Sequence, residues 1–218
     1  MSTSVKKISQ AFGAIAHEYD AWYEDNLLFA NELKAIKALW PWERPALEVG
    51  VGTGRFATAL EIEFGLDPTF EMLALARNRG IRCVCGLAEA LPFRDQSLTT
   101  VAFFFTLCFI PQKKAALKEA FRVLKVGGRV LLGMVPRESS WGQFYTQKGQ
   151  KGHPLYRFAQ FLTIDEALAL AKEVGFSLGR SSSILFFEPE EPPRPESPRS
   201  GLASEAGFVV LELIKKAS

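Results

Sequence analysis

The 218-residue chain carries 26 lysines and arginines against 24 aspartates and glutamates, a formal net charge of +2, and 48% apolar residues. This length favours a single domain over residues 1–218. The charge is balanced and the sequence has no run of five basic residues, so it lacks the positive charge that nucleic-acid-binding proteins use to contact phosphates. No apolar run is long enough to cross a bilayer, so we expect a cytoplasmic protein with no membrane and no nucleic-acid partner.

Residues 1–44 are predicted to form a helical N-terminal extension. The segment LLFANELKAIKALW places Leu28, Leu33 and Ile36 near one face at helical spacing, and Pro41 ends it.

Strands and helices are predicted to alternate from residue 45 to residue 135. The expected strands are short and almost wholly apolar, at 46–50, 63–67, 81–86, within 98–110, and at 129–135. The expected helices lie between them, at 55–62, 68–80 and 112–128. Strands that are apolar on both faces are typical of a parallel sheet covered by helices on both sides, so the pattern predicts a doubly wound α/β fold.

The pattern changes after residue 135. Residues 136–160 are polar and aromatic and are interpreted as a long excursion, followed by a helix at 163–176 with a capping-box start at Thr163 and Glu166. Two further strands, 181–189 and 206–216, fit an antiparallel pair at the sheet edge. The segment 188–204 is rich in Pro, Glu and Ser, and we expect it to be a mobile loop.

The turn after the first strand indicates a ligand site. Glu48 ends the apolar run, and glycines follow at 50, 52 and 54, which lets the backbone approach a ligand closely. The spacing is G-x-G-x-G and not the dinucleotide fingerprint G-x-G-x-x-G. A carboxylate here would repel a pyrophosphate and favour a cationic group, by roughly 4 kcal/mol at about 4 Å, so the turn favours S-adenosylmethionine over NAD. The simpler alternative is an ordinary tight turn.

A second acid follows at the end of the next strand. Asp67 lies 17 residues beyond Gly50 and can accept hydrogen bonds from the two hydroxyls of a ribose. It can also cap the helix that starts at Pro68, and the two roles are compatible.

Four segments resemble the class I S-adenosylmethionine-dependent methyltransferases, and most closely the small-molecule enzymes of ubiquinone and menaquinone biosynthesis. The segments are LEVGVGTGRFA, GLDPTFEMLALAR, GLAEALPFRDQSLTTV and EAFRVLKVGGRVLLG, in that order. The resemblance implies a mostly parallel seven-stranded sheet with an antiparallel last strand, a core at 45–135, a helical lid at 1–44, and an acceptor side at 136–160.

The resemblance also implies roles for individual residues. The methionine part of the cofactor would contact Glu48, Gly50, Gly52 and Thr106, and the ribose would contact Asp67. The adenine would lie near Pro68 and Met72. Leu87 stands where the family usually has an acid that binds the adenine amino group, so backbone groups of Leu87 and Ala88, or the side chain of Glu89, would substitute for it. The lid positions Tyr19 and Asp20 would face the cofactor and the substrate.

The acceptor is expected to be a small, partly apolar molecule. The aromatic residues of the lid and the excursion would line its pocket: Tyr19, Trp22, Tyr23, Trp141, Phe144, Tyr145 and Tyr156. His17, Tyr19 and His153 are candidates for a general base, although a single histidine is more often a surface residue. No metal site is predicted, and the three cysteines, Cys83, Cys85 and Cys108, are expected to be buried thiols in a reducing compartment.

Three functions therefore stay open at the level of sequence. The first is methyl transfer to a small molecule by in-line displacement. The second is a non-catalytic relative that binds the cofactor as a sensor or scaffold, since Leu87 and Cys108 depart from the family pattern. The third is a dinucleotide oxidoreductase. The oligomeric state, monomer or homodimer, is left open as well.

Overall fold

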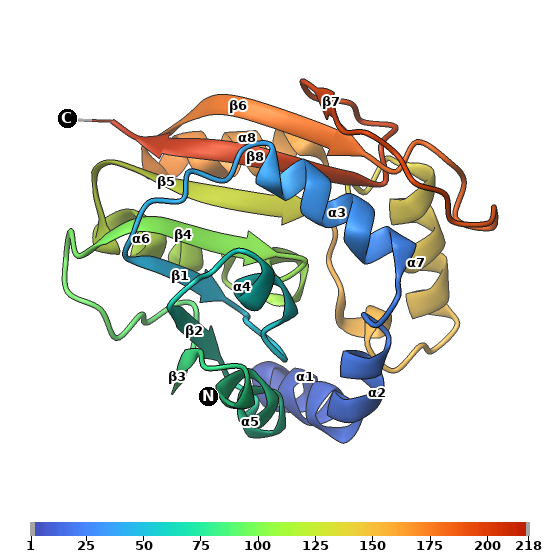
Figure 1. Ribbon diagram of the computed structural model, residues 1–218, viewed down its shortest axis with the longest axis horizontal. Coiled ribbons are helices and arrows are strands. Elements are labelled where there is room, and N and C mark those ends of the chain that lie inside the picture. Colours follow the sequence, from blue (N-terminus) through green and yellow to red (C-terminus); the bar gives the residue numbers. More distant parts are fainter. Residues whose placement is uncertain (1–2, 217–218) are drawn as a thin grey trace.

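The computed structural model describes residues 3–216 and contains one mixed sheet (Figure 1). Its strand order is β3-β2-β1-β4-β5-β8-β6-β7. The strands are β1 (Ala46–Val49), β2 (Phe64–Asp67), β3 (Arg82–Cys85), β4 (Leu98–Phe104), β5 (Leu124–Met134), β6 (Phe176–Ile184), β7 (Arg199–Ser200) and β8 (Phe208–Lys215).

The predicted sheet is confirmed with one addition. Strands β3, β2, β1, β4 and β5 are parallel, and β8 lies antiparallel between β5 and β6. Seven strands were expected, and the eighth is the two-residue β7, which pairs with Ser182 and Ser183 of β6. A two-residue pairing has no periodic pattern of its own, so it could not be read from the sequence.

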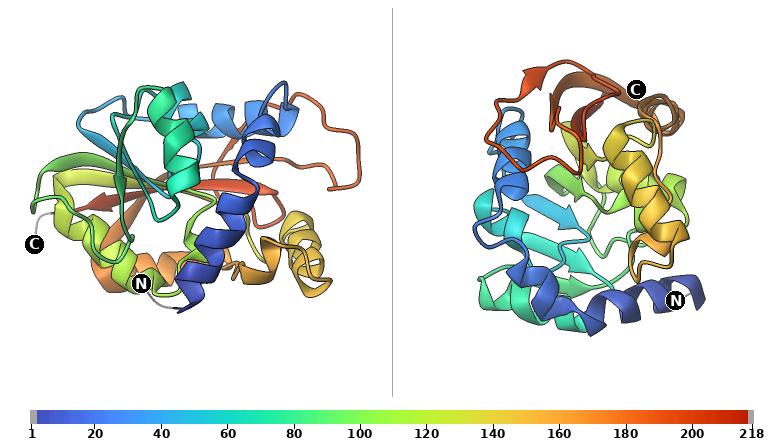
Figure 2. Two further views of the ribbon diagram at one scale, coloured as in Figure 1. Left: turned by 90° about the horizontal axis from the view of Figure 1, so that it is seen from below. Right: turned by 90° about the vertical axis from the view of Figure 1, so that its right-hand side faces the viewer.

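Helices cover both faces of the sheet, which explains why the parallel strands are apolar on both sides (Figure 2). One face packs against α3 (Leu27–Lys37), α4 (Arg55–Ala59) and α5 (Phe70–Asn78). The other face packs against α6 (Lys113–Val123) and α8 (Ile164–Val174), and the predicted capping box of Thr163 and Glu166 starts α8. The helices α1 (Thr3–Ala14), α2 (Ala16–Ala21) and α7 (Ser140–Gln150) lie beyond the carboxyl ends of the parallel strands.

Several predicted boundaries were wrong, and the strand expected at 181–189 is β6, which begins at Phe176 and ends at Ile184. The helix expected at 112–128 ends at Val123, and β5 begins at Leu124, which pairs with Leu98. The excursion at 136–160 contains the helix α7, whose cap is the Ser139 hydroxyl, accepting a hydrogen bond from the Gly142 backbone N–H at 3.0 Å. In α7 only Trp141 and Gly142 are buried, so the apolar periodicity that would predict a helix is weak.

The proline-rich segment 188–204 makes defined contacts with α3 and β6. The Asn31 side chain donates a hydrogen bond to the carbonyl of Arg194 and accepts one from the backbone N–H of Glu196. The Glu196 carboxylate accepts hydrogen bonds from the backbone N–H groups of Leu185 and Phe186. The contacts fix an average path, and the mobility of the loop stays a prediction.

Candidate active site

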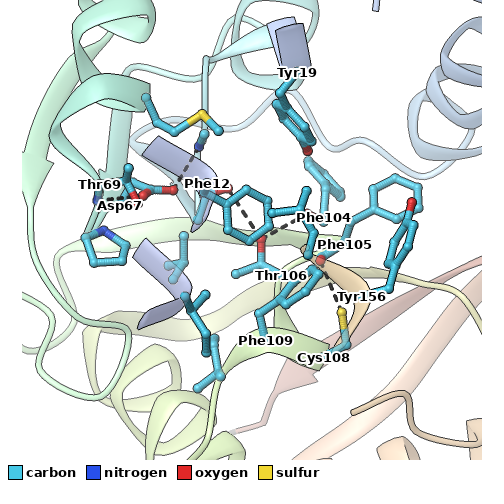
Figure 3. A pocket seen from close by; sticks show the side chains of 18 of the residues that line it. Phe12, Tyr19, Asp67, Thr69, Phe104, Phe105, Thr106, Cys108, Phe109 and Tyr156 are labelled. Carbon is cyan, nitrogen blue, oxygen red and sulfur yellow. Dashed lines mark hydrogen bonds between the residues drawn. The ribbon is translucent and has the colours of Figure 1, made fainter. Parts of the chain in front are cut away.

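A cavity of about 460 Å³ opens at the carboxyl ends of β1, β2 and β4. Its walls come from the turn after β1, the end of β2, the segment after β4, the helices α1 and α2, and residues of α7 and the chain that follows it. This is the edge at which open α/β sheets bind ligands, and the volume is within the range of small-molecule sites. Figure 3 shows Asp67 and Thr69 at one end of the cavity and Tyr19 and Tyr156 toward the other.

The glycine turn supplies bare backbone to this cavity. Gly50 and Gly52 both adopt a positive φ, +73° and +52°, which favours glycine. A β-carbon at Gly50 would overlap the side chain of Thr106. A β-carbon at Gly52 would meet only Tyr19 Cε1, at 3.9 Å, so the space above Gly52 is open to a ligand.

Asp67 is held at the wall of the cavity by the backbone around it. Its Oδ2 accepts a hydrogen bond from the Gly52 N–H at 3.1 Å, and its Oδ1 accepts one from the Thr69 N–H at 2.9 Å. Burial raises the pKa of Asp67, although these two hydrogen bonds oppose the shift. The helix α5 begins at Phe70 with Thr69 as its cap residue, so Asp67 supports the turn before the helix and is not itself the cap.

Glu48 lies behind the glycine turn and is not among the residues that line the cavity. Its side chain is buried, and burial raises its pKa well above the ordinary value, against the effect of the Ala57 backbone N–H. Its Oε2 has no hydrogen-bond partner within residues 3–216. An unpaired buried carboxylate oxygen is costly, which is the pattern expected where a ligand or a bridging group completes the bonding.

Further residues predicted to bind the cofactor do line the cavity: Pro68, Met72, Ala88, Glu89 and Thr106. Leu87, at the position where the family usually has an acid, lines it too. Phe105, also in the wall, has a φ of +56°. A left-handed conformation at a bulky residue is uncommon and is often found at functional sites.

The opposite end of the cavity is aromatic. Tyr19, Tyr23, Tyr145 and Tyr156 line it, and the hydroxyls of Tyr19 and Tyr23 are 2.7 Å apart. The rings of Tyr145 and Tyr156 lie 4.5 Å apart, centroid to centroid. Trp22 lines the cavity as predicted.

Two aromatic predictions were wrong. Trp141 and Phe144 do not line the cavity. The Trp141 indole is buried against Phe187 and donates a hydrogen bond to its carbonyl at 2.7 Å. Phe144 lies against Trp141 and under Lys148. The helical register of α7 turns Tyr145 and Lys148 toward the cavity instead.

Glu32 lines the cavity and was missed by the sequence reasoning. It lies on the buried face of α3, and burial raises its pKa to about 8. It is four residues from both Leu28 and Ile36, which the apolar spacing had placed on the inner face of this helix. The position of an acid within this apolar stripe was therefore a signal, present in the sequence, that Glu32 is buried.

The two histidines differ in position. His17 is exposed and lies outside the cavity wall, so the structure does not bring it to the site. His153 lines the cavity, where its Nδ1 accepts hydrogen bonds at 3.3 Å from the backbone N–H groups of Leu155 and Tyr156. Burial, together with nearby Lys148, lowers the pKa of His153.

Asp20 does not face the cavity, which corrects the expectation for the Tyr19–Asp20 pair. Its carboxylate accepts hydrogen bonds from Arg55 at 2.7 and 2.9 Å and from Arg79 at 2.8 Å. Burial alone would raise the pKa of Asp20, but the hydrogen bonds from Arg55, Thr53 and Arg79 lower it to about 2. Tyr19 and Asp20 are consecutive, so this anchor fixes the helix that carries Tyr19 over the glycine turn.

The comparisons with known proteins agree with this geometry. Residues 47–132 match a family model described as a methyltransferase domain. A solved Thermotoga maritima structure, described as a SAM-dependent methyltransferase and possible histamine N-methyltransferase, is 36% identical and has a TM-score of 0.90, covering 96% of this chain and 100% of that one. An uncharacterized protein of Methanocaldococcus jannaschii is 36% identical over 94% of this chain and 98% of its own length. A ubiquinone/menaquinone biosynthesis C-methyltransferase of Xanthomonas oryzae is 28% identical over 93% and 82%.

The chain is a class I S-adenosylmethionine-dependent methyltransferase.

The cavity of this methyltransferase fits S-adenosylmethionine as the methyl donor. The backbone at Gly52 leaves room for a ligand, Asp67 presents a carboxylate, and Glu48 holds an unpaired buried oxygen beneath the turn. Two acids at this end of the cavity suit a donor that carries a sulfonium and an ammonium group.

Other expectations for the methyltransferase concern metals, thiols and membranes. Within the described part of the chain, no cluster of three or more His, Cys, Asp or Glu could hold a metal ion. The three cysteines are free thiols, but Cys83 and Cys108 are only half-buried and Cys85, at the edge strand β3, is exposed, so the expectation of buried thiols was wrong. Among residues 3–216, no helix is both long enough and apolar enough to cross a membrane.

Proposed function

We propose that this methyltransferase transfers the methyl group of S-adenosylmethionine to a small-molecule acceptor by in-line displacement. One observation carries the proposal: the glycine turn and the aromatic wall belong to a single cavity and meet at Tyr19, which stands over Gly52. A donor on the turn and an acceptor on the aromatic wall would then share one enclosed space.

The donor end of the cavity is assigned to residues 48–69 with parts of 72–89 and Thr106. In this assignment Gly50 and Gly52 bring the backbone close to the methionine part, and Glu48 acts on it from behind the turn. Asp67 accepts hydrogen bonds from the ribose, because each of its oxygens has a second lone pair beside the backbone bond it already accepts. Pro68, Met72, Ala88 and Glu89 surround the adenine.

The acceptor end of the cavity is assigned to Tyr19, Tyr23, Glu32, Tyr145 and Tyr156. Methyl transfer needs little covalent chemistry from the protein, since the methyl carbon is already activated by its cationic sulfur. The chain contributes by holding the nucleophile about 3–3.5 Å from that carbon and excluding water, which can supply roughly 7–11 kcal/mol of the barrier reduction. The aromatic wall and the anchored lid supply these conditions.

Two measurements test the proposal. Calorimetry with S-adenosylhomocysteine should show binding at a single site, and Gly52→Val should remove it. Turnover is followed as the release of S-adenosylhomocysteine, with amines, phenols and thiols as acceptors and with oligonucleotides and denatured protein as macromolecular controls. Turnover with small molecules alone supports the proposal, and turnover with a macromolecule alone contradicts it.

A further inference from the structure

Glu32 is a buried acid that faces the cavity without a partner. Its side chain comes from α3, is 5% exposed, and lines the acceptor end of the cavity. Within residues 3–216 its carboxyl forms no hydrogen bond and no ion pair. A buried carboxyl without a hydrogen-bond partner is costly to retain, so such a group often serves a ligand or chemistry.

Four tyrosines line the same cavity as this acid. The Glu32 carboxyl acts electrostatically on Tyr19, Tyr23, Tyr145 and Tyr156, and helps raise the pKa of each, after the larger effect of burial. All four hydroxyls therefore stay protonated near neutral pH. An acid beside aromatic faces is a common arrangement for binding an organic cation, because the ring faces and the carboxylate both attract positive charge.

The other charged groups of the wall do not neutralise Glu32. Lys148 is exposed and its ammonium lies 4.3 Å from the centre of the Phe144 ring. Burial and nearby Lys148 lower the pKa of His153, which favours the neutral imidazole. Burial raises the pKa of the Cys108 thiol to about 12, so it is neutral as well. Glu18 and Asp67 add negative charge to the same cavity.

We propose that Glu32, with the tyrosines around it, binds the amino group of a small protonated amine, and that its carboxylate takes the proton which that amine must lose before methylation. The inference rests on the proposed function, because it names the acceptor class of the same cavity. It also assigns Glu32 as the acceptor-binding base, in place of His17 and His153.

The proton and electron balance of the step is complete without a further reactant. The ammonium gives one proton to a Glu32 carboxylate oxygen, which leaves a neutral amine with a free lone pair. The nitrogen forms the N–C bond to the methyl group while the bond from that carbon to sulfur breaks, and its electron pair stays on sulfur. The product leaves as a methylated ammonium ion, and the proton held by Glu32 is lost to solvent.

The experiment compares matched amines and alcohols on the full chain loaded with S-adenosylhomocysteine. The probes are benzylamine, phenethylamine and tryptamine, each paired with the alcohol of the same skeleton, and their affinities are measured by calorimetry. The wild-type chain is expected to bind at least one amine roughly 10- to 150-fold more tightly than its alcohol, the scale of a charge-assisted hydrogen bond. The isosteric Glu32→Gln should lose that preference, and Glu173→Gln, an exposed acid on α8 paired with Lys114, should keep it.

Proton release separates this role from a merely structural one. At pH 6.5 the free Glu32 carboxyl is protonated, since its pKa is about 8, and an ammonium bound beside it favours the carboxylate. Amine binding should therefore release about one proton in wild type and close to none in Glu32→Gln, as measured by calorimetry in buffers of different ionisation heat.

Each outcome decides between definite alternatives. Failure of the wild-type chain to bind S-adenosylhomocysteine would contradict the proposed function itself. If S-adenosylhomocysteine binds but no amine is preferred, or if Glu32→Gln keeps the preference, only the inference is overturned. A large loss of S-adenosylhomocysteine affinity in Glu32→Gln would also overturn it, because Glu32 would then belong to the donor end. Equal proton release on amine binding by wild type and by Glu32→Gln would also overturn the inference.

Discussion

The end of the cavity that we assign to the donor is built largely from the backbone of residues 48–69, whereas the end that we assign to the acceptor is built from side chains of residues 19–32 and 145–156. At the donor end, the positive φ of Gly50 and Gly52 and the two hydrogen bonds to Asp67 define the surface. At the acceptor end, rings and hydroxyls from helices distant in sequence meet above the sheet (Figure 3).

This difference explains how proteins of one fold can bind the same methyl donor and yet act on different acceptors. A surface of backbone keeps its shape when neighbouring side chains change, since its geometry depends on turns and hydrogen bonds. A surface of side chains changes with each substitution in the lid or α7, while the sheet beneath it is unaffected. Substitutions at the two ends should therefore affect donor binding and acceptor turnover separately. Three predictions test that separation, and a fourth tests the anchor of the lid.

The largest effect is expected from Gly52→Val. The new side chain would project into the space between the turn and Tyr19, so S-adenosylhomocysteine affinity should fall about 1000-fold or more, which is roughly 4 kcal/mol. Calorimetry measures the affinity, and urea unfolding measures the strain of a β-branched residue at positive φ, about 1–3 kcal/mol.

Gly80→Val is the matched control for this substitution. Gly80 also has a positive φ, +84°, but no atom lies within 4 Å of a β-carbon placed there. The control should show a similar cost in stability with donor affinity unchanged. If both variants lose affinity equally, the strain of the fold and not the occupation of the donor end would be responsible.

The next effect is expected from Asp67→Ala. The change removes the acceptor for the ribose and also leaves the Gly52 and Thr69 N–H groups without their partner. We expect S-adenosylhomocysteine affinity to fall by about 1.5–3 kcal/mol, the scale of hydrogen bonds to a charged group. Asp95→Ala, an exposed acid paired with Arg122, should leave the affinity as it is. An affinity within twofold of wild type in Asp67→Ala would remove Asp67 from the donor end.

The anchor of the lid gives a smaller effect on stability. Asp20→Asn removes a half-buried ion pair with Arg55 and Arg79, and it should lower the free energy of unfolding at pH 7 by about 1–3 kcal/mol. Glu24→Gln removes the largely exposed partner of the same Arg55, and it should change the free energy of unfolding by less than about 0.5 kcal/mol. Urea unfolding measures both.

The pH dependence of this anchor has a definite sign. The pKa of Asp20 is about 2 in the fold against an ordinary value of 3.8, so the ionised form is favoured by folding. Its contribution is therefore fully present above pH 3.8 and is lost as the pH falls toward 2. The difference in the free energy of unfolding between wild type and Asp20→Asn should therefore become smaller as the pH falls from 3.8 toward 2. A difference that is constant with pH would show that the stabilisation is not ionic.

The donor end could be predicted from sequence because it is local. Glu48, the glycines and Asp67 lie within 20 residues, and the strand–turn–helix pattern places them at one sheet edge. The orientation of Glu48 could not be predicted, since it depends on which face of β1 the side chain occupies. Glu48 is buried behind the turn and is not among the residues that line the cavity.

For the acceptor end, the sequence predicted the type of residue, aromatic, but not which of these residues face the cavity. Aromatic residues were expected there, but the register of α7 decides that Tyr145 faces the cavity and Trp141 does not. Glu32 was overlooked because an acid on a helix is ordinarily solvated, and its burial follows from the packing of α3 on the sheet. The short β7 depends on a pairing between distant segments, which local propensity does not encode.

The smallest effect is expected from Tyr19→Phe, and it decides to which end Tyr19 belongs. The ring keeps its place over Gly52, and only the hydroxyl bonded to Tyr23 is lost, a cost in stability of about 0.5–1.5 kcal/mol. If Tyr19 serves the acceptor, S-adenosylhomocysteine affinity should stay within about twofold of wild type while the KM of the acceptor rises. Tyr23→Phe breaks the same hydrogen bond from the other side, so it should reproduce any effect of the bond alone. A loss of donor affinity in Tyr19→Phe but not in Tyr23→Phe would mean that the Tyr19 hydroxyl contacts the donor, and the boundary between the two ends would move to Tyr23.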